Sequence, residues 1–339
     1  MTVSDRRLVA AWLLTCAALV FAIVVVGGIT RLTHSGLSMV EWQPLVGALP
    51  PVSQADWQAL FAKYQQTPEF KLVNHGMDLE GFKTIFWWEY FHRLLGRTIG
   101  VIFLLPFLWF LARRKLEPRV AWQLGGVFVL GALQGGLGWY MVKSGLVDDP
   151  RVSHLRLTGH LGVALAIFAA ELWIALDLLF PERTRRPRGA LARALPLAIF
   201  AMALSGGMVA GLRAGLAYNS FPLMNGYVVP PETLMLEPWW KNFIYNMAAV
   251  QLVHRAFFWT LLVLVPLAWW RERAFPAANA LLGLFVLQAM LGIATLLLHV
   301  PIALAAAHQA GAVLLLAAAL WMAHSTPAEQ APMRAHHPA

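Results

Sequence analysis

The chain alternates between long apolar runs without charged residues and shorter polar connections. Several runs are shorter than the roughly 20 residues that cross a bilayer, so their helices should extend into flanking charged sequence. We expect the second helix to begin near Phe86 and the sixth near Val250. The fourth should continue through Glu171 and Asp177 to the membrane interface. The pattern thus predicts eight spanning helices, with charge-free runs at Leu8–Thr30, Thr98–Ala112, Val120–Val142, Leu157–Ala170, Ala194–Leu212, Ala256–Trp270, Ala274–Leu298 and Val300–Ala323.

The composition agrees with an all-α membrane protein, because 59% of the 339 residues are hydrophobic and only 13% are charged. The formal net charge of +9 does not indicate nucleic-acid binding, because most cations lie at the chain ends and in connections that follow even-numbered helices. Cytoplasmic segments have this distribution, so both termini are predicted to lie in the cytoplasm. The cations concerned are Arg6, Arg7, Arg113, Arg114, Lys115, Arg119, Arg183, Arg185, Arg186, Arg188, Arg193, Arg271, Arg273 and Arg334.

The connections from odd-numbered to even-numbered helices should then face outward. In the first, Ser53 and Asp56 predict the capped start of an amphipathic helix, and a second short helix is expected near Leu79. No cleavable signal peptide is expected, because the first apolar run is too long. The single cysteine, Cys16, excludes a disulfide within the chain. The outer connections are roughly Arg31–Ile85, Lys143–Arg156, Arg213–Ala249 and a short turn near His299-Val300-Pro301.

Several landmarks recur in the two halves of the chain. Because each half has an even number of helices, the halves should share one orientation, related by an axis along the membrane normal. We predict two four-helix bundles, residues 1–181 and 182–325, followed by a disordered tail, 326–339. The matching segments are Gly27-Gly28 with Gly206-Gly207, Gly36-Leu37-Ser38-Met39 with Gly215-Leu216-Ala217-Tyr218, and Leu133-Gln134-Gly135-Gly136-Leu137-Gly138 with Leu287-Gln288-Ala289-Met290-Leu291-Gly292.

Four histidines occupy matching positions of this repeat, His92 and His160 in the first half and His254 and His308 in the second. All four are expected within the first third of even-numbered helices, toward the outer face. An imidazole in an apolar helix needs a partner, which a metal or a hydrogen bond can supply. Because two helices of one bundle can present imidazoles to each other, each pair predicts a bis-histidine haem site.

Charged neighbours add to this picture. Glu89 lies one helical turn before His92 and is matched by Gln251, so only one of the two sites has a carboxylate. Glu89 is a candidate general acid or base, and the alternative is an ion pair with Arg93 or Arg31. The cationic candidates for haem propionates, each of which could equally be an interfacial anchor, are Arg93, Arg255, Arg97, Arg31 and Arg213. His34 and His75 are further candidates for contact with a substrate or a partner.

These residues resemble the haem A synthase family, and the resemblance covers nearly the whole chain. The segments that carry it are Gly27-Gly28-Ile29-Thr30-Arg31-Leu32-Thr33, Ser35-Gly36-Leu37-Ser38-Met39, Trp87-Trp88-Glu89-Tyr90-Phe91-His92-Arg93-Leu94-Leu95-Gly96-Arg97, Ala210-Gly211-Leu212-Arg213-Ala214-Gly215-Leu216-Ala217 and His308-Gln309-Ala310-Gly311. The resemblance implies an oxidoreductase that oxidises the C8 methyl group of haem O to the formyl group of haem A, the cofactor of terminal oxidases.

The resemblance also implies roles for individual residues. His254 and His308 would ligate a bound haem b, whereas His92 and His160 would flank the substrate haem. Glu89 would be the carboxylate of the reactive site. Some members of the family carry a cysteine pair in the first outer segment, and this chain has none there. It therefore resembles the type of proteobacteria and mitochondria, which implies a bacterial inner membrane.

Haem O is the expected substrate, and the other expected partners are membrane lipid, haem O synthase, an electron acceptor and a second copy of the chain. Two other functions fit parts of the pattern. A diheme b-type cytochrome would carry electrons through both sites, but it has no need of the difference between Glu89 and Gln251. A transporter would also contain repeated bundles, but it predicts polar breaks at the membrane midplane.

Overall fold

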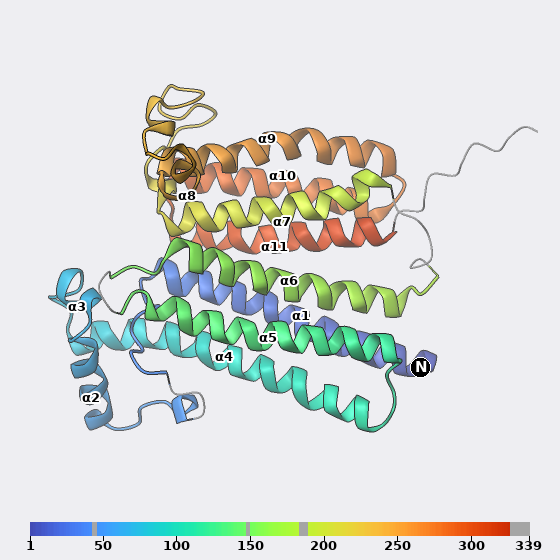
Figure 1. Cartoon of the computed structure of the whole chain (residues 1–339), viewed down its shortest axis with the longest axis horizontal. Coiled ribbons are helices and arrows are strands. Elements are labelled where there is room, and N and C mark those ends of the chain that lie inside the picture. Colours follow the sequence, from blue (N-terminus) through green and yellow to red (C-terminus); the bar gives the residue numbers. More distant parts are fainter. Residues whose placement is uncertain (43–45, 147–149, 183–188, 326–339) are drawn as a thin grey trace, which may run out of the picture.

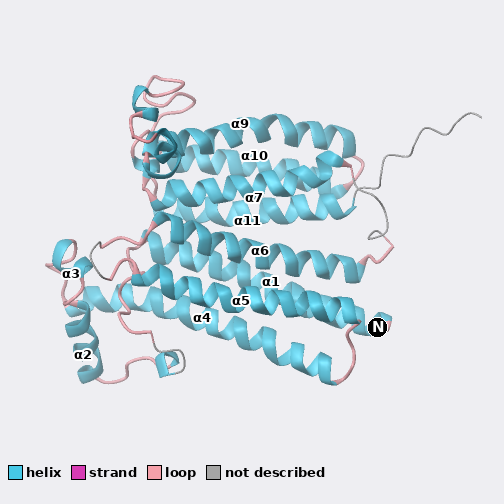
Figure 2. Ribbon diagram, viewed as in Figure 1, coloured by secondary structure: helices cyan, strands magenta, loops and turns pink. Residues whose placement is uncertain are grey.

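The computed structural model describes residues 1–42, 46–146, 150–182 and 189–325, and the regular structure of this part is helical (Figure 2). Within these described residues, eight helices are long and apolar enough to cross a membrane, which agrees with the predicted number. The arginine run 183–188 and the predicted tail 326–339 lie outside the described residues. The eight helices are α1 (Val3–Leu32), α4 (Leu79–Ala112), α5 (Pro118–Lys143), α6 (His154–Leu179), α7 (Ala190–Gly211), α9 (Met247–Glu272), α10 (Pro276–Leu297) and α11 (Ile302–Ser325).

The two halves of the chain form neighbouring groups of helices (Figure 1). In the first, α1 packs against α4 and α6, and α5 also contacts both of these helices. In the second, α7 packs against α9 and α11, and α10 contacts both. Each contact in one half thus has its counterpart in the other. Between the groups, α6 packs on α7, α11 on α1, and α6 on α11.

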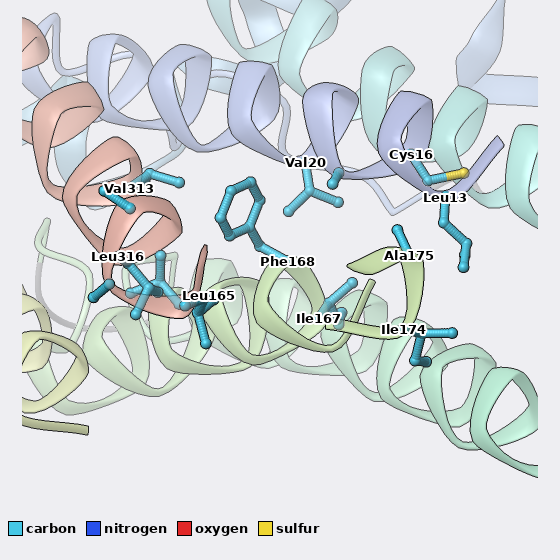
Figure 3. Close-up of a cluster of buried hydrophobic side chains, with 14 of the residues drawn as sticks. Leu13, Cys16, Val20, Leu165, Ile167, Phe168, Ile174, Ala175, Val313 and Leu316 are labelled. Carbon is cyan, nitrogen blue, oxygen red and sulfur yellow. The ribbon is translucent and has the colours of Figure 1, made fainter. Parts of the chain in front are cut away.

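The apolar core is continuous between the two groups. Figure 3 shows its centre, where Val20 of α1 lies near Phe168 of α6, and Leu316 of α11 lies near Leu165 of α6. Cys16 is buried in the same cluster and is a free thiol, as expected for a single cysteine. Close packing of α1, α6 and α11 therefore joins the two halves into one body.

The second spanning helix begins earlier than predicted. Asp78 caps α4 by accepting a hydrogen bond from the backbone N–H of Gly81, so the expected short helix near Leu79 and the start near Phe86 belong to one continuous helix. The hydropathy pattern did not predict the first part of α4 as helix, because its apolar residues pack on the outer segment. Phe82 and Phe86 pack there in an aromatic cluster with Trp57.

The end of the bundle where α1 and α7 finish carries the outer connections, residues 46–78, 150–153, 212–246 and 298–301, and we call it the looped end. As predicted, Ser53 and Asp56 form a capping box, which starts α2 (Gln54–Tyr64). His299 and Val300 adopt left-handed conformations in the predicted short turn. The other short elements are η1 (Val46–Ala48), α3 (Pro68–Leu72), η2 (Ala214–Leu216), η3 (Pro231–Leu234), η4 (Trp239–Lys241) and α8 (Asn242–Tyr245).

Of the two acidic residues of α6 that were expected to meet the membrane interface, Glu171 differs from that expectation, whereas Asp177 lies near the end of the helix. Glu171 is buried, with 1% of its surface exposed, and its Oε2 atom has no hydrogen-bond partner. Asp177 accepts a hydrogen bond from Nε2 of the buried His324 at 3.0 Å. This pair joins the ends of α6 and α11, so Asp177 contributes to the packing of the two halves.

Candidate functional site

Each of the four predicted histidines packs its imidazole against a glycine of a neighbouring helix. A methyl group added to any of these glycines would lie within 3.3 Å of an imidazole atom, closer than nearly all real contacts of that kind. The glycines therefore leave room for the rings, and they come from equivalent helices of the two halves. The pairs are His92 with Gly27, His160 with Gly138, His254 with Gly206, and His308 with Gly292.

The histidines do not all lie in the first third of their helices. His160 and His308 are the seventh residues of α6 and α11, and His254 is the eighth of α9. His92 is the fourteenth residue of α4, because that helix extends further beyond the membrane than predicted. His92 and His254 nevertheless occupy equivalent positions in their two helix groups, because the glycines that they contact correspond to each other in the repeat.

A hydrogen bond fixes the orientation of His254. The hydroxyl of Ser205 donates to the carbonyl of Met202 at 2.7 Å, so its oxygen is left to accept from Nδ1–H of His254 at 2.8 Å. A proton on Nδ1 leaves Nε2 as the free nitrogen lone pair, and such a lone pair binds a metal. At the equivalent place beside His92 the chain has Val26, which offers no such acceptor.

The other two histidines have glutamine neighbours at matching positions. Gln134 lies 3.3 Å from Nε2 of His160, and Gln288 donates to the backbone carbonyl of His308 at 2.8 Å. The Nδ1 atoms of both rings are buried without a hydrogen-bond partner. A buried nitrogen without a partner is costly, so these rings have unused capacity to bind.

The histidines are also paired within each half. His92 lies within electrostatic range of His160, and His254 lies within electrostatic range of His308. Within the described ranges, no group of three or more His, Cys, Asp or Glu side chains could hold a bare metal ion. Two paired imidazoles, each packed against a glycine, instead fit a metal that brings its own planar ligands. The residues present therefore fit a haem in each half.

Glu89 has a structural partner for each of its oxygens. Oε2 accepts from the hydroxyl of Ser38 at 2.8 Å and from the backbone N–H of Met39 at 2.7 Å. Oε1 accepts from Arg93, whose guanidinium also donates to the carbonyls of Met39 and Glu41 at 2.8 and 3.0 Å. The ion pair with Arg93 is one of the two alternatives left open by the sequence. Together these two side chains hold the segment that follows α1 against α4.

The second half repeats this arrangement without the carboxylate. Gln251 donates to the carbonyl of Ala214 at 3.1 Å, and Arg255 donates to the carbonyl of Tyr218 at 3.2 Å. Tyr218 corresponds to Met39 in the repeat, so both arginines hold the same position of the segment that follows the first helix of their half. The difference between Glu89 and Gln251 accompanies a second difference, because Ser38 is matched by Ala217.

Most of the remaining predicted residues lie at the looped end, and Arg97 lies further along α4. Arg213 donates to Nδ1 of His34 at 3.1 Å, so these two residues connect the halves. Burial lowers the pKa of His34, and the positive charges of Arg213 and Arg31 lower it further. Arg97 is half-buried on α4 one turn beyond Arg93, and His75 is exposed in the outer segment. Contact of Arg93, Arg97 or Arg255 with a haem propionate stays a prediction.

Two features of the site were not found from the sequence. The bond from His254 to Ser205 depends on how α7 packs against α9, although the replacement of Val26 by Ser205 is visible once the glycine pairs are aligned. The second feature is a buried network in the outer segment, in which the Tyr64 hydroxyl donates to Glu69 and accepts from Asn74. No local pattern signalled it, because its members come from α2, α3 and the turn after α3.

Comparison of the sequence with known proteins identifies the family of the chain. The model of the cytochrome oxidase assembly protein family matches residues 10–320. The chain is 59% identical to a haem A synthase of Nitrosospira multiformis, over 94% of this chain and 93% of that protein. It is 51% identical to a haem A synthase of Nitrosomonas eutropha, over 93% and 92% of the two chains. It is 48% identical to that of Parvibaculum lavamentivorans, over 95% of each.

Proposed function

The chain belongs to the cytochrome oxidase assembly protein family, and from this premise we propose that His254 and His308 hold a haem b while His92 and His160 receive haem O. The protein is a haem A synthase, a multi-pass membrane enzyme that oxidises haem O to haem A. The C8 methyl group of the substrate becomes a formyl group. The outstanding question is how two similar histidine pairs come to have different roles.

The hydrogen bond between Ser205 and His254 carries this assignment. A permanent cofactor needs an imidazole whose tautomer and orientation are fixed before the metal binds, and Ser205 provides this at 2.8 Å. A substrate must enter and leave, so its histidines should be held less firmly. His92 has Val26 where His254 has Ser205, which supports the first half as the substrate site. A haem b held by His254 and His308 would supply a one-electron store beside the substrate.

Glu89 is proposed as the carboxylate of the reactive site. It lies one helical turn from His92, and the second half has an amide in its place. Its hydrogen bonds with Ser38, Met39 and Arg93 hold the carboxylate in one position. A fixed carboxylate at this place can stabilise positive charge that develops on the substrate or accept a proton from the carbon being oxidised. Two rounds of oxidation, each adding one oxygen atom to the carbon with its electrons passing to the external electron acceptor, and loss of water from the resulting geminal diol would then give the formyl group.

The proposed orientation places both termini in the cytoplasm of a bacterial inner membrane and the histidine pairs toward the outer face. The arginine distribution supports this orientation. In the structure, the N-terminus of α1 and the end of α11 lie at the end of the bundle opposite the looped end (Figure 1). The proposed division into residues 1–181 and 182–325 follows the matched helix contacts of the two halves. Haem O synthase, an electron acceptor and a second copy of the chain are proposed partners.

The test is the haem content of purified variants. We expect the wild type to contain one haem b with smaller amounts of haem O and haem A. Replacing His254 or His308 with Ala should remove haem b, whereas replacing His92 or His160 should keep haem b and stop haem A formation. The matched control is His75→Ala, an exposed histidine outside both pairs. Two equivalent haem b groups, lost equally in all four variants, would instead show an electron-transfer cytochrome.

A further inference from the structure

A pocket of about 250 Å³ lies on α9 at the looped end, beneath the connection that follows α7. Its walls are almost entirely apolar. Leu252, Ala256 and Trp259 form the helix side, and Leu223 and Val228 form the connection side. Trp259 and Val228 are also exposed at the surface of the protein. The pocket is therefore open to apolar chains in the surrounding membrane.

This pocket is separate from the proposed haem b site. Successive residues of a helix point about 100° apart, so Leu252, Ala256 and Trp259 point roughly 140–160° away from His254. The ring of His254 packs instead against Gly206 of α7, on the inner side of α9. The pocket therefore lies on the face of α9 opposite the proposed haem ligand.

A buried cation lines the pocket. Arg255 is only 7% exposed, and among the residues that the structure describes it has no acidic partner. Its Nε atom is buried without a hydrogen-bond partner. Its terminal nitrogens donate only to uncharged oxygens, namely the carbonyls of Tyr218, Ser220, Pro222 and Leu223 and the amide of Gln251. A buried guanidinium without an anion is costly, so this position calls for negative charge from outside the chain.

The first half of the chain shows which partner Arg255 lacks. The equivalent arginine, Arg93, has the carboxylate of Glu89 as its partner, whereas Arg255 has the amide of Gln251 in the same place. The pocket offers space for an external anion where the first half uses its own. An anion bound there must also be compatible with apolar walls, which excludes a freely hydrated ion as the best occupant.

We propose that this pocket binds an acidic phospholipid. Its phosphate would lie against Arg255, in place of the haem propionate expected there from the sequence, and part of an acyl chain would lie against Leu252, Ala256 and Trp259. Arg255 is the ninth residue of α9, so it lies roughly 12 Å from the start of the helix, in the half nearer the looped end. Phe221 stacks on Trp259 with ring centroids 5.8 Å apart, and aromatic rings are typical of this boundary. Charge complementarity favours an acidic lipid over a neutral one.

The test uses native mass spectrometry of the haem-loaded protein after exposure to mixed vesicles with equal amounts of phosphatidylglycerol and phosphatidylcholine. One basic group near a membrane favours an acidic lipid by about fivefold, so we expect about fivefold preferential retention of one phosphatidylglycerol. Ala256→Trp fills the pocket from an exposed position of α9 and should abolish this retention. Val263→Trp adds the same bulk to the same helix away from the pocket and should retain it.

A second variant tests the charge separately from the space. Gln251→Glu gives Arg255 the carboxylate that Arg93 already has, so the preference for phosphatidylglycerol should disappear while phosphatidylcholine still binds. Equal retention of the two lipids by the wild type would overturn the proposal. So would the same phosphatidylglycerol retention in Ala256→Trp as in Val263→Trp. Lipid retention is read independently of haem chemistry, so failure here would leave the proposed function unaffected.

Discussion

Ser205 accepts a hydrogen bond from Nδ1 of His254 at 2.8 Å, because its own hydroxyl proton is already donated to the carbonyl of Met202. The pair joins α7 to α9 inside the second half. Hydrogen-bond partners of this kind orient a metal-binding imidazole and set its tautomer. The structure therefore distinguishes His254 from His92, which is also followed by an arginine but has no equivalent of Ser205.

Replacing Ser205 with Ala should weaken haem b binding without unfolding the protein. Loss of such a partner typically lowers metal affinity by roughly 10- to 100-fold. The low-spin haem b spectrum, measured during titration with an imidazole competitor, should show displacement at lower competitor concentration. Val26→Ser, the converse change beside His92, should make release of the substrate haem slower. Equal competitor sensitivity in wild type and Ser205→Ala would rule out the orienting role.

Gly292→Ala should reduce haem b occupancy. The added methyl group would lie 2.7 Å from Cε1 of His308, so the imidazole must move out of its present position. Gly283→Ala is the control, because it lies on the same helix and an added methyl group meets no atom within 4 Å there. Haem b per protein, from the pyridine haemochrome spectrum, should fall in the first variant and stay normal in the second. A normal value in both would mean that this close packing is not needed.

Glu89→Gln should stop the chemistry more than it harms the fold. The amide keeps the shape and can still accept from Ser38 and Met39, but the ion pair with Arg93 is lost. Loss of a catalytic acid or base typically costs about 10²–10⁴-fold in rate. Chromatography should show haem O or its alcohol derivative accumulating with little haem A, while haem b is retained. If Glu89 only holds the segment after α1, haem A should fall only as far as folded protein does.

Glu69 should make the stability of the outer segment depend on pH. Burial raises its pKa to about 7 from an ordinary value of 4.5, although the hydrogen bond from Tyr64 opposes the shift. The folded protein then binds more protons than the unfolded chain between these values, so the free energy of unfolding falls as pH rises through this window. Thermal melting between pH 4.5 and 7 should be flatter in Glu69→Gln than in the wild type. Parallel curves would contradict this role.

Cysteine labelling tests the orientation in the membrane. The only native thiol, Cys16, is buried and makes the wild type an unlabelled control. Gln66 and Arg273 are exposed at opposite ends of the bundle. An impermeant maleimide added to spheroplasts should label Gln66→Cys, whereas Arg273→Cys should react only after the membrane is opened. The reverse result would place the termini outside.

The sequence predicted the helices and the histidines well because both depend on strong, simple signals. Charge-free runs mark spans wherever a helix faces lipid or the core, and four histidines at repeat positions are difficult to explain separately. The prediction for α4 failed where that condition failed, since Phe82 and Phe86 pack on α2 outside the apolar run. Glu171 was placed at the interface because its charge suggested water, yet the helix buries it.

The partners of individual polar groups could not be predicted in the same way. Sequence spacing allowed Glu89 to pair with Arg93 or Arg31, and only the packed structure shows Arg93 as its partner. Ser205 meets His254 across 49 residues of chain, so no local pattern reports their contact. Such bonds are set by how the helices rotate and cross, and this information is spread over the whole interface.

The contact between His34 and Arg213 bears on how the two halves of the chain arose. These residues occupy the same position of the repeat, both have left-handed backbones, with φ of 54° and 56°, and they touch each other across the two halves. In a symmetric homodimer, a residue near the twofold axis meets its own copy in the same manner. A four-helix ancestor that paired with itself would have brought these positions together before a gene duplication joined the copies. After such a fusion, each copy of the position would be free to mutate separately, which would allow a histidine and an arginine to meet there.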